Sequence, residues 1–254
     1  MQRLLLLGFL LSSALLNAQN DRLTAARAVL GDVDPDVRIA ALDSLAATGR
    51  VSPELYLALG NAHYEDDRPG LAILNYERGL RLAPANADLR NNLRFVREDA
   101  GIADLRVREF FLAGWWRNLG AFLGAGLSQW LALLFWTLAV GGAAYWFLRR
   151  KSMAEERRFA LLPLAAVALI LAGLFYALGS SRAAYLTDDR EAVLTARSAT
   201  LRVAPGPDAT VETELDEGVK LRILDEFDGY VKVSLENGRQ GYLPEEGVSS
   251  IVVR

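Results

Sequence analysis

Two long stretches without a charged side chain constrain this 254-residue chain more than any other feature. No Asp, Glu, Lys, Arg or His occurs from Asn118 to Leu148, or from Phe159 to Gly179. About 20 apolar residues in a helix cross the roughly 30 Å hydrocarbon core of a bilayer. The core helix of a globular protein rarely stays apolar on every side for that length. We therefore expect transmembrane helices at residues 127–148 and 159–179.

The connection between these two helices is short and basic. Residues 149–158 begin with Arg149-Arg150-Lys151 and end with Arg157-Arg158. Short loops rich in Lys and Arg stay in the cytoplasm, so this loop is expected inside and both flanking regions outside. This predicts a two-pass protein of the bacterial inner membrane with its N-terminal and C-terminal domains in the periplasm. Because neither helix carries an ionisable residue, we interpret both as anchors and not as a transport path.

The N-terminus and the approach to the first membrane helix carry two further membrane signals. Residues 1–18 combine Arg3, an apolar run and small residues before Ala18, the pattern of a secretory signal peptide. An uncleaved anchor is the alternative, and in both cases the chain after residue 18 is exported. Residues 106–126 mix charges with aromatic rings, which suits a segment at the bilayer interface in contact with lipid. Those rings belong to Phe110, Phe111, Trp115, Trp116 and Phe122.

Residues 19–105 have the pattern of a helical domain. Between Pro53 and Asn86, apolar and small residues recur at helical spacing in two runs, a helix-turn-helix unit of 34 residues. The unit resembles a tetratricopeptide repeat at Tyr56, Leu59, Gly60, Tyr64, Ala72, Tyr76, Leu80 and Pro84. Gly79 replaces the usual alanine and is expected to weaken the second helix. Because one repeat cannot bury its own faces, we expect neighbouring helices: a degenerate helix pair at 22–30 and 36–47 and a closing helix at 87–104.

Such arrays bind extended peptides on a concave face. By the resemblance, the candidate peptide-binding residues are Leu57, Asn61, Tyr64, Glu65 and Asn92. The two asparagines match those that hold a ligand backbone in some members of the family. The alternative is that they only satisfy the repeat consensus and carry no ligand.

Residues 190–254 predict a small all-β barrel, since short runs rich in Val, Leu and Ile alternate with turn signals. Asn237-Gly238 indicates a tight hairpin in which both residues accept positive φ. The stretch resembles a bacterial SH3-like domain, notably at Gly229-Tyr230-Val231-Lys232-Val233 and Gly241-Tyr242-Leu243-Pro244. The resemblance implies an aromatic ligand cleft for peptide or peptidoglycan, at Phe227, Tyr230 and Tyr242. Alternatively, the tyrosines only cover a small core. Many acidic side chains favour a basic or neutral ligand over an anionic one.

Catalytic machinery is not evident in the sequence. There is no Cys, and His63 is the only histidine, so we predict no enzyme, no metal site and no cofactor. The net charge of -3 argues against nucleic acid as a partner.

The whole chain predicts a multidomain membrane protein: an all-α tetratricopeptide-repeat domain, two transmembrane helices and a C-terminal all-β SH3-like barrel. Segments in this order resemble the BatE-type proteins of the Bat (aerotolerance) system. The resemblance implies a non-catalytic scaffold beside membrane proteins with von Willebrand factor A domains and, indirectly, a MoxR-type AAA+ ATPase. The alternative is a cell-wall factor that binds peptidoglycan and recruits wall enzymes. We also expect the two outer domains to be independent modules.

Overall fold

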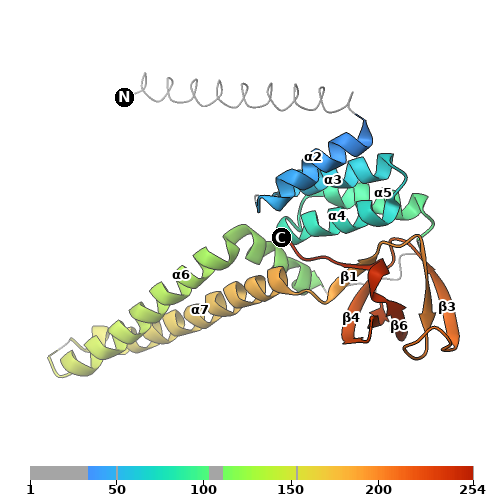
Figure 1. Ribbon diagram of the computed structural model, residues 1–254. Helices are drawn as coiled ribbons and strands as arrows, with labels where there is room; N and C mark the ends of the chain where they lie inside the picture. The colour runs from blue at the N-terminus through green and yellow to red at the C-terminus, as the bar shows by residue number, and fades with distance from the viewer. Residues whose placement is uncertain (1–33, 50, 103–110, 153, 254) are drawn as a thin grey trace, which may run out of the picture.

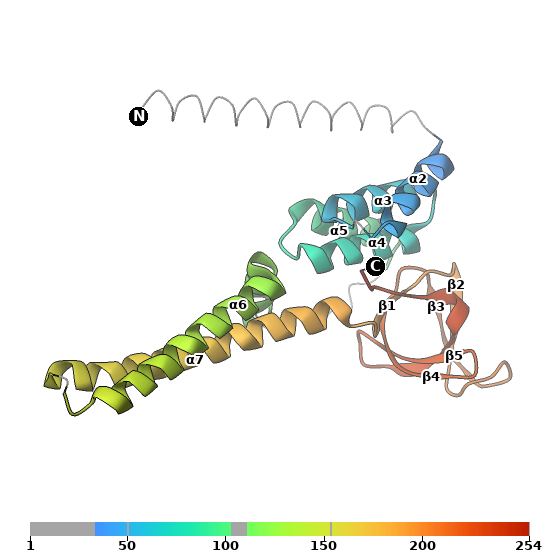
Figure 2. The ribbon, with the colours of Figure 1, turned by 60° about the vertical axis from the view of Figure 1, so that its left-hand side comes forward.

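The computed structural model describes residues 34–49, 51–102, 111–152 and 154–253 (Figure 1). The predicted signal peptide and the helix expected at 22–30 lie outside the described residues, as does the beginning of the aromatic segment. A helical domain and a β domain lie side by side at one end of a long helical hairpin (Figures 1 and 2).

The helical domain follows the predicted spacing. Its helices are α2 (Pro35–Ala47), α3 (Pro53–Glu65), α4 (Pro69–Leu82) and α5 (Ala87–Asp99). Three of them begin at a side chain that accepts a hydrogen bond from a free backbone N–H of the first turn. These caps are Asp34, Ser52 and Asn86. Helix α2 thus covers the segment 36–47, where a helix was expected, and begins one residue earlier.

Glycines let α3, α4 and α5 approach closely. A Cβ atom on Gly60 would lie 2.3 Å from Cε1 of Tyr76, and one on Gly79 would lie 2.8 Å from the methyl groups of Leu89. The sequence suggested that Gly79 weakens its helix. In the structure Gly79 makes room for α5, so the lower helix propensity of glycine is offset by packing between helices.

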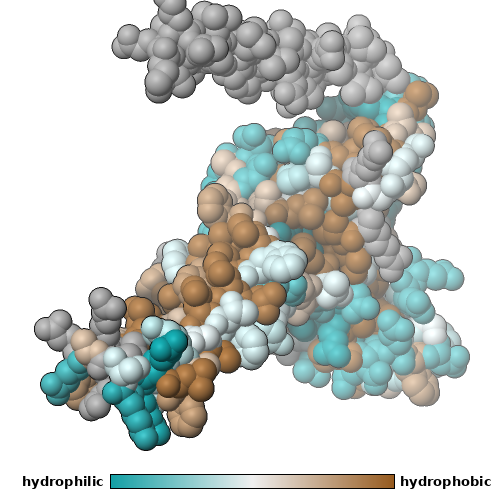
Figure 3. Space-filling view, turned by 90° about the vertical axis from the view of Figure 1, so that its left-hand side faces the viewer, coloured by the Kyte–Doolittle hydropathy of each residue, from teal (hydrophilic) through white to brown (hydrophobic). Residues whose placement is uncertain are grey.

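The hairpin consists of α6 (Phe111–Arg149) and α7 (Glu155–Thr187), which pack along each other. Both are long and apolar enough to cross a membrane. Their surface is largely apolar, with hydrophilic residues at the tip of the hairpin (Figure 3). Helix α6 starts well before the predicted span and is broken at Gly124, whose φ of 72° and ψ of 161° are not helical. Helix α7 runs eight residues beyond the charge-free block that ends at Gly179.

The β domain is a curved antiparallel sheet around its own core (Figure 2). Its elements are β1 (Glu191–Leu194), β2 (Ser198–Arg202), β3 (Val211–Asp216), β4 (Lys220–Phe227), β5 (Tyr230–Leu235), β6 (Gln240–Pro244), the 3-10 helix η1 (Glu245–Gly247) and β7 (Val248–Ser250). The strand order is β3-β2-β6-β5-β4-β1-β7. The predicted all-β architecture is thus confirmed as an antiparallel sheet.

One turn differs from expectation. At the β5–β6 hairpin only Gly238 has positive φ, and its N–H donates to the carbonyl of Leu235 over 2.9 Å. This is a three-residue loop in which a type I turn precedes a left-handed glycine. The tight turn with two positive φ values lies instead at Asp228-Gly229, between β4 and β5. The hairpin prediction was right, but the turn geometry was wrong.

The helical domain and the β domain share a core, contrary to the expected independence. Val193 of β1 and Ile251 after β7 are fully buried in one cluster with Ala72 and Ile73 of α4. Val253 packs against a second helical cluster around Tyr56. Because apolar side chains from distant parts of the chain leave water together, the domains form one unit.

Ion pairs surround this shared core. Lys220 Nζ of β4 lies 3.1 Å from Glu77 of α4 and 3.3 Å from Glu191 of β1. Glu191 also pairs with Arg81 of α4 at 3.3 Å. Arg81 further donates to the carbonyl of Asp188, the residue that follows α7. The buried charges are therefore compensated across the domain boundary.

Candidate functional site

The outer face of the β domain carries the strongest candidate site. Along β5 and β6 the side chains of Val231, Val233 and Leu243 are buried in the core. Residues between them point to the opposite face, because side chains alternate along a strand. Tyr230 and Tyr242 therefore lie outside the core.

Strand pairing arranges the outer side chains in two rows. In the first row Tyr242 lies directly opposite Lys232 on one side and Arg202 on the other. In the second row Tyr230 lies opposite Phe227 and Pro244. Residues directly opposite in an antiparallel sheet share a face with Cβ atoms about 5 Å apart. The structure thus brings the three predicted residues Phe227, Tyr230 and Tyr242 onto one surface, called here the aromatic face.

The groups of the aromatic face are exposed to different degrees: Phe227 is exposed, while Tyr230, Lys232 and Tyr242 are half-buried. Phe227 is 62% exposed. The hydroxyls of Tyr230 and Tyr242 form no hydrogen bond, and Lys232 forms no ion pair, within the described part of the chain. Arg202 uses one nitrogen to hold the carbonyl of Ala209 at 2.7 Å. Two cations therefore flank Tyr242, a local charge that the acidic composition of the domain did not suggest. A ligand with a carboxylate beside an apolar or ring-like group fits this surface.

The predicted peptide-binding asparagines are engaged with each other. Asn61 Oδ1 accepts a hydrogen bond from Tyr76 Oη at 2.8 Å and another from Asn92 Nδ2 at 2.9 Å. Burial raises the pKa of Tyr76 to about 12, so its hydroxyl stays protonated and donates. The network joins α3, α4 and α5, which favours the alternative that these asparagines stabilise the helical array.

The other predicted concave residues also have partners inside the molecule. Tyr64 donates to Asp99 at 2.9 Å and packs edge-on against Phe95, with ring centroids 5.7 Å apart. Glu65 forms an ion pair with Arg38 of α2. Leu57 is half-buried against the shared core. Binding of a peptide by these five residues stays a prediction.

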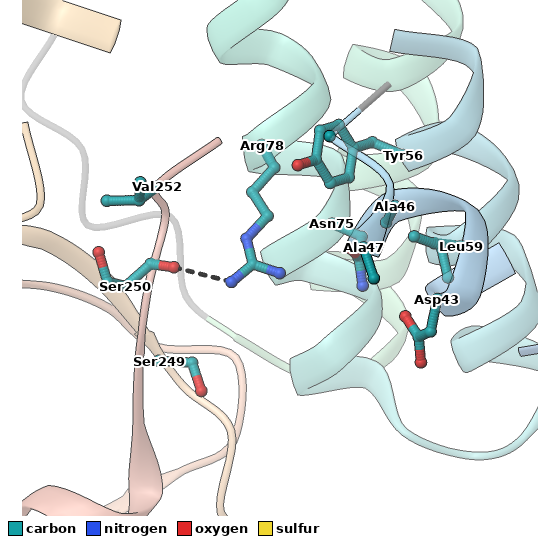
Figure 4. Close-up of a pocket in the computed structure, with 11 residues that line it drawn as sticks. Asp43, Ala46, Ala47, Tyr56, Leu59, Asn75, Arg78, Ser249, Ser250 and Val252 are labelled. Carbon is teal, nitrogen blue, oxygen red and sulfur yellow. Dashed lines mark hydrogen bonds between the residues drawn. The ribbon is translucent and has the colours of Figure 1, made fainter. Parts of the chain in front are cut away.

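A cavity of about 500 Å³ lies between α2, α3 and α4 on one side and β7 with the residues after it on the other (Figure 4). Arg78 reaches from α4 and donates to the carbonyl of Ser250 over 3.0 Å. Asn75 and Asp43 lie on the other side of Arg78. Sequence reasoning missed this cavity because its walls come from opposite ends of the chain.

His63 is buried near this region. Burial lowers its pKa below the usual 6.5, and the nearby Asp43 opposes that shift only in part. Its imidazole is therefore neutral at pH 7. Among the described residues, no group of three or more potential metal ligands gathers. The geometry assigns His63 a place in the packing of α3.

Comparison with known proteins identifies one part of the chain. Residues 201–248 match the family described as the bacterial dipeptidyl-peptidase Sh3 domain. The match runs from the last two residues of β2 to the first residue of β7 and includes the whole aromatic face. No curated protein and no solved structure matches the chain. The β domain is therefore an SH3-like domain, of a type found in bacterial cell-wall-associated proteins.

Proposed function

We propose that this chain is a non-catalytic, membrane-anchored adaptor that binds its partner through the aromatic face of the SH3-like domain. The observation that carries the proposal is the juxtaposition of Tyr230, Tyr242 and Phe227 with two cations on a partly exposed face of the sheet. The apolar hairpin supports membrane anchoring, and the basic loop at its tip supports placement of both outer domains in the periplasm.

The finer form of this proposal is a scaffold of a Bat-type complex. Its support is the order of segments along the chain, together with the α3–α4 unit, whose small residues suit a tetratricopeptide-type array. Partners would then be membrane proteins with von Willebrand factor A domains and, through them, a MoxR-type ATPase. The shared core supports a scaffold that presents both outer domains as one surface.

Binding to the cell wall is the second candidate function. It is favoured by the SH3-like match and by Arg202 and Lys232 beside Tyr242, since the peptides of peptidoglycan carry carboxylates. In that case the protein links the inner membrane to the wall.

Co-sedimentation of the full-length protein in nanodiscs with purified peptidoglycan tests the choice. If the aromatic face binds the wall, Tyr242→Ala weakens binding about 10-fold or more, because truncation of a central aromatic residue costs upwards of about 1.4 kcal/mol. The matched control is Leu224→Ala, an exposed residue at the β4 bulge outside the two rows.

The outcomes separate the candidates. Equal binding by Tyr242→Ala and the wild type would refute the role of the aromatic face in wall binding. The scaffold would be established instead by two results together. The wild type does not sediment with peptidoglycan, and it recovers von Willebrand-type membrane proteins from native membranes while Tyr242→Ala does not. Recovery of neither ligand through this face would overturn the proposed function.

A further inference from the structure

The first part of α6 does not run alongside α7 as the rest of the hairpin does. A Cβ on Gly179 would lie 3.1 Å from Cβ of Ser128, so these two positions are opposite each other. Trp116 lies twelve residues before Ser128 and would face a position twelve residues beyond Gly179 in a straight antiparallel pair. Instead, its Nε1 donates to Ser181 Oγ over 2.8 Å. Residues 111–123 therefore cross α7 and do not extend along it.

The break at Gly124 produces this crossing. Its φ of 72° lies in the region that glycine adopts readily and other residues rarely do. Before the break, a Cβ at the Gly120 position would lie 3.5 Å from Leu178 and 3.6 Å from Cβ of Arg182. The contacts of residues 116, 120 and 128 thus all fall within a short stretch of α7. We call residues 111–123 the transverse helix.

Large aromatic side chains dominate the face of the transverse helix that is turned away from α7, and the polar Asn118 lies among them. Phe111, Trp115 and Phe122 are 73%, 58% and 85% exposed. They recur at helical spacing on one side, while Trp116 and Gly120 meet α7 on the other. Aromatic rings on such a face suit the headgroup layer of a bilayer. The helix crosses α7 near Gly179, where the charge-free block ends. In a hairpin that spans the membrane, the end of this block lies at the depth of the headgroup layer.

Arg182 connects the transverse helix to the helical domain. It is 7% exposed and lies against Gly120. Its Nη2 donates to the carbonyl of Leu82, the last residue of α4, over 2.9 Å. The guanidinium groups of Arg182 and Arg81 lie 6.0 and 5.3 Å from the ring centre of Tyr185. The end of α4 is therefore held at the same level as the crossing.

We propose that the transverse helix lies flat in the headgroup layer of the bilayer that α6 and α7 span. Arg182 contacts both this helix and the end of α4, and it thereby fixes the helical domain against the membrane surface. This inference rests on the membrane anchoring of the proposed function. It adds a lipid-binding surface that fixes the height and orientation of the outer domains, and with them the aromatic face.

Spin labels on the full-length protein test the depth of the helix, since the chain has no native cysteine. Single variants Phe122→Cys, Leu134→Cys and Val203→Cys place labels on the transverse helix, in the span and on the β domain, all at exposed positions. In vesicles of phosphatidylethanolamine and phosphatidylglycerol, the label at 122 should collide with oxygen more often than with a water-soluble nickel chelate. The inference would be overturned if the label at 122 were as accessible to nickel as the label at 203. In that case, a label at 134 that is accessible to oxygen would show that the membrane anchor itself still holds. Nickel accessibility at 134 would overturn the anchor itself.

A second measurement tests the role of Arg182. Labels at Phe122→Cys and Phe95→Cys, the latter exposed on α5, report the distance between the transverse helix and the helical domain. Pulsed dipolar spectroscopy should give a narrow distribution that broadens in Arg182→Ala. An unchanged distribution in that variant would refute the connection through Arg182.

Discussion

Replacement of Ile251 by alanine should loosen the helical domain as well as the β domain. Ile251 follows the last strand, yet its side chain is fully buried in the cluster with Ala72 and Ile73 of α4. Truncation of a buried isoleucine to alanine costs about 2–5 kcal/mol, from lost transfer free energy and the cavity left behind. Since a domain is stable by only about 5–15 kcal/mol, this loss is a large share of the total.

Hydrogen exchange measured by mass spectrometry reads this effect in each segment separately. If the domains unfold as one unit, peptides from α4 and β1 should both exchange between about 30-fold and about 4,000-fold faster in Ile251→Ala, because each 1.4 kcal/mol is tenfold. Val203→Ala, at an exposed position of the β domain, serves as the control with almost no change. Faster exchange in β1 with unchanged exchange in α4 would refute the shared core and restore the independence expected from the sequence.

A pH titration and three further substitutions test the packing. Burial alone would lower the pKa of Lys220, but the charges of Glu77 and Glu191 outweigh burial and raise this pKa above 10.5. The free energy of unfolding, measured by urea titration, should therefore hold up to about pH 10 and fall as the pH rises through the pKa of the folded state. Glu77→Gln should remove much of that pH dependence, and a profile equal to the wild type would contradict the pairing. Gly60→Ala should destabilise by about 1–3 kcal/mol despite better helix propensity, because the new methyl group overlaps Tyr76; a higher melting temperature would contradict this. Gly124→Ala should cost about 1–3 kcal/mol, because its combination of φ 72° and ψ 161° is essentially restricted to glycine; no change in thermal stability would argue against the break.

Local structure was largely predictable because its signals are local. The caps at Ser52 and Asn86 and the turn glycines lie within a few residues of the elements they start or connect. Charge-free length predicted the two long helices for the same reason. At the β5–β6 hairpin the sequence predicted the turn, but the loop length was decided by the pairing of Leu235 with Arg239.

The candidate site was predictable only in part. Phe227, Tyr230 and Tyr242 were singled out from motif and residue type, and the strand register placed them on one face. The cations beside Tyr242 could not be inferred, because Arg202 lies forty residues away and meets it only through the β2–β6 pairing. Asn61 and Asn92 looked like ligand groups, while the packing of three helices turned them toward each other.

The sequence by itself determined which segments are helices, strands or apolar spans, since spacing, capping and turn residues act over a few positions. Only the tertiary structure decided that Val193 and Ile251 complete the core of the helical domain. Burial of apolar surface has no direction, so an isoleucine near the end of a chain carries no mark of the domain it will enter. The crossing at Gly124 follows the same logic: a glycine permits the bend, and the contact between Trp116 and Ser181 selects it.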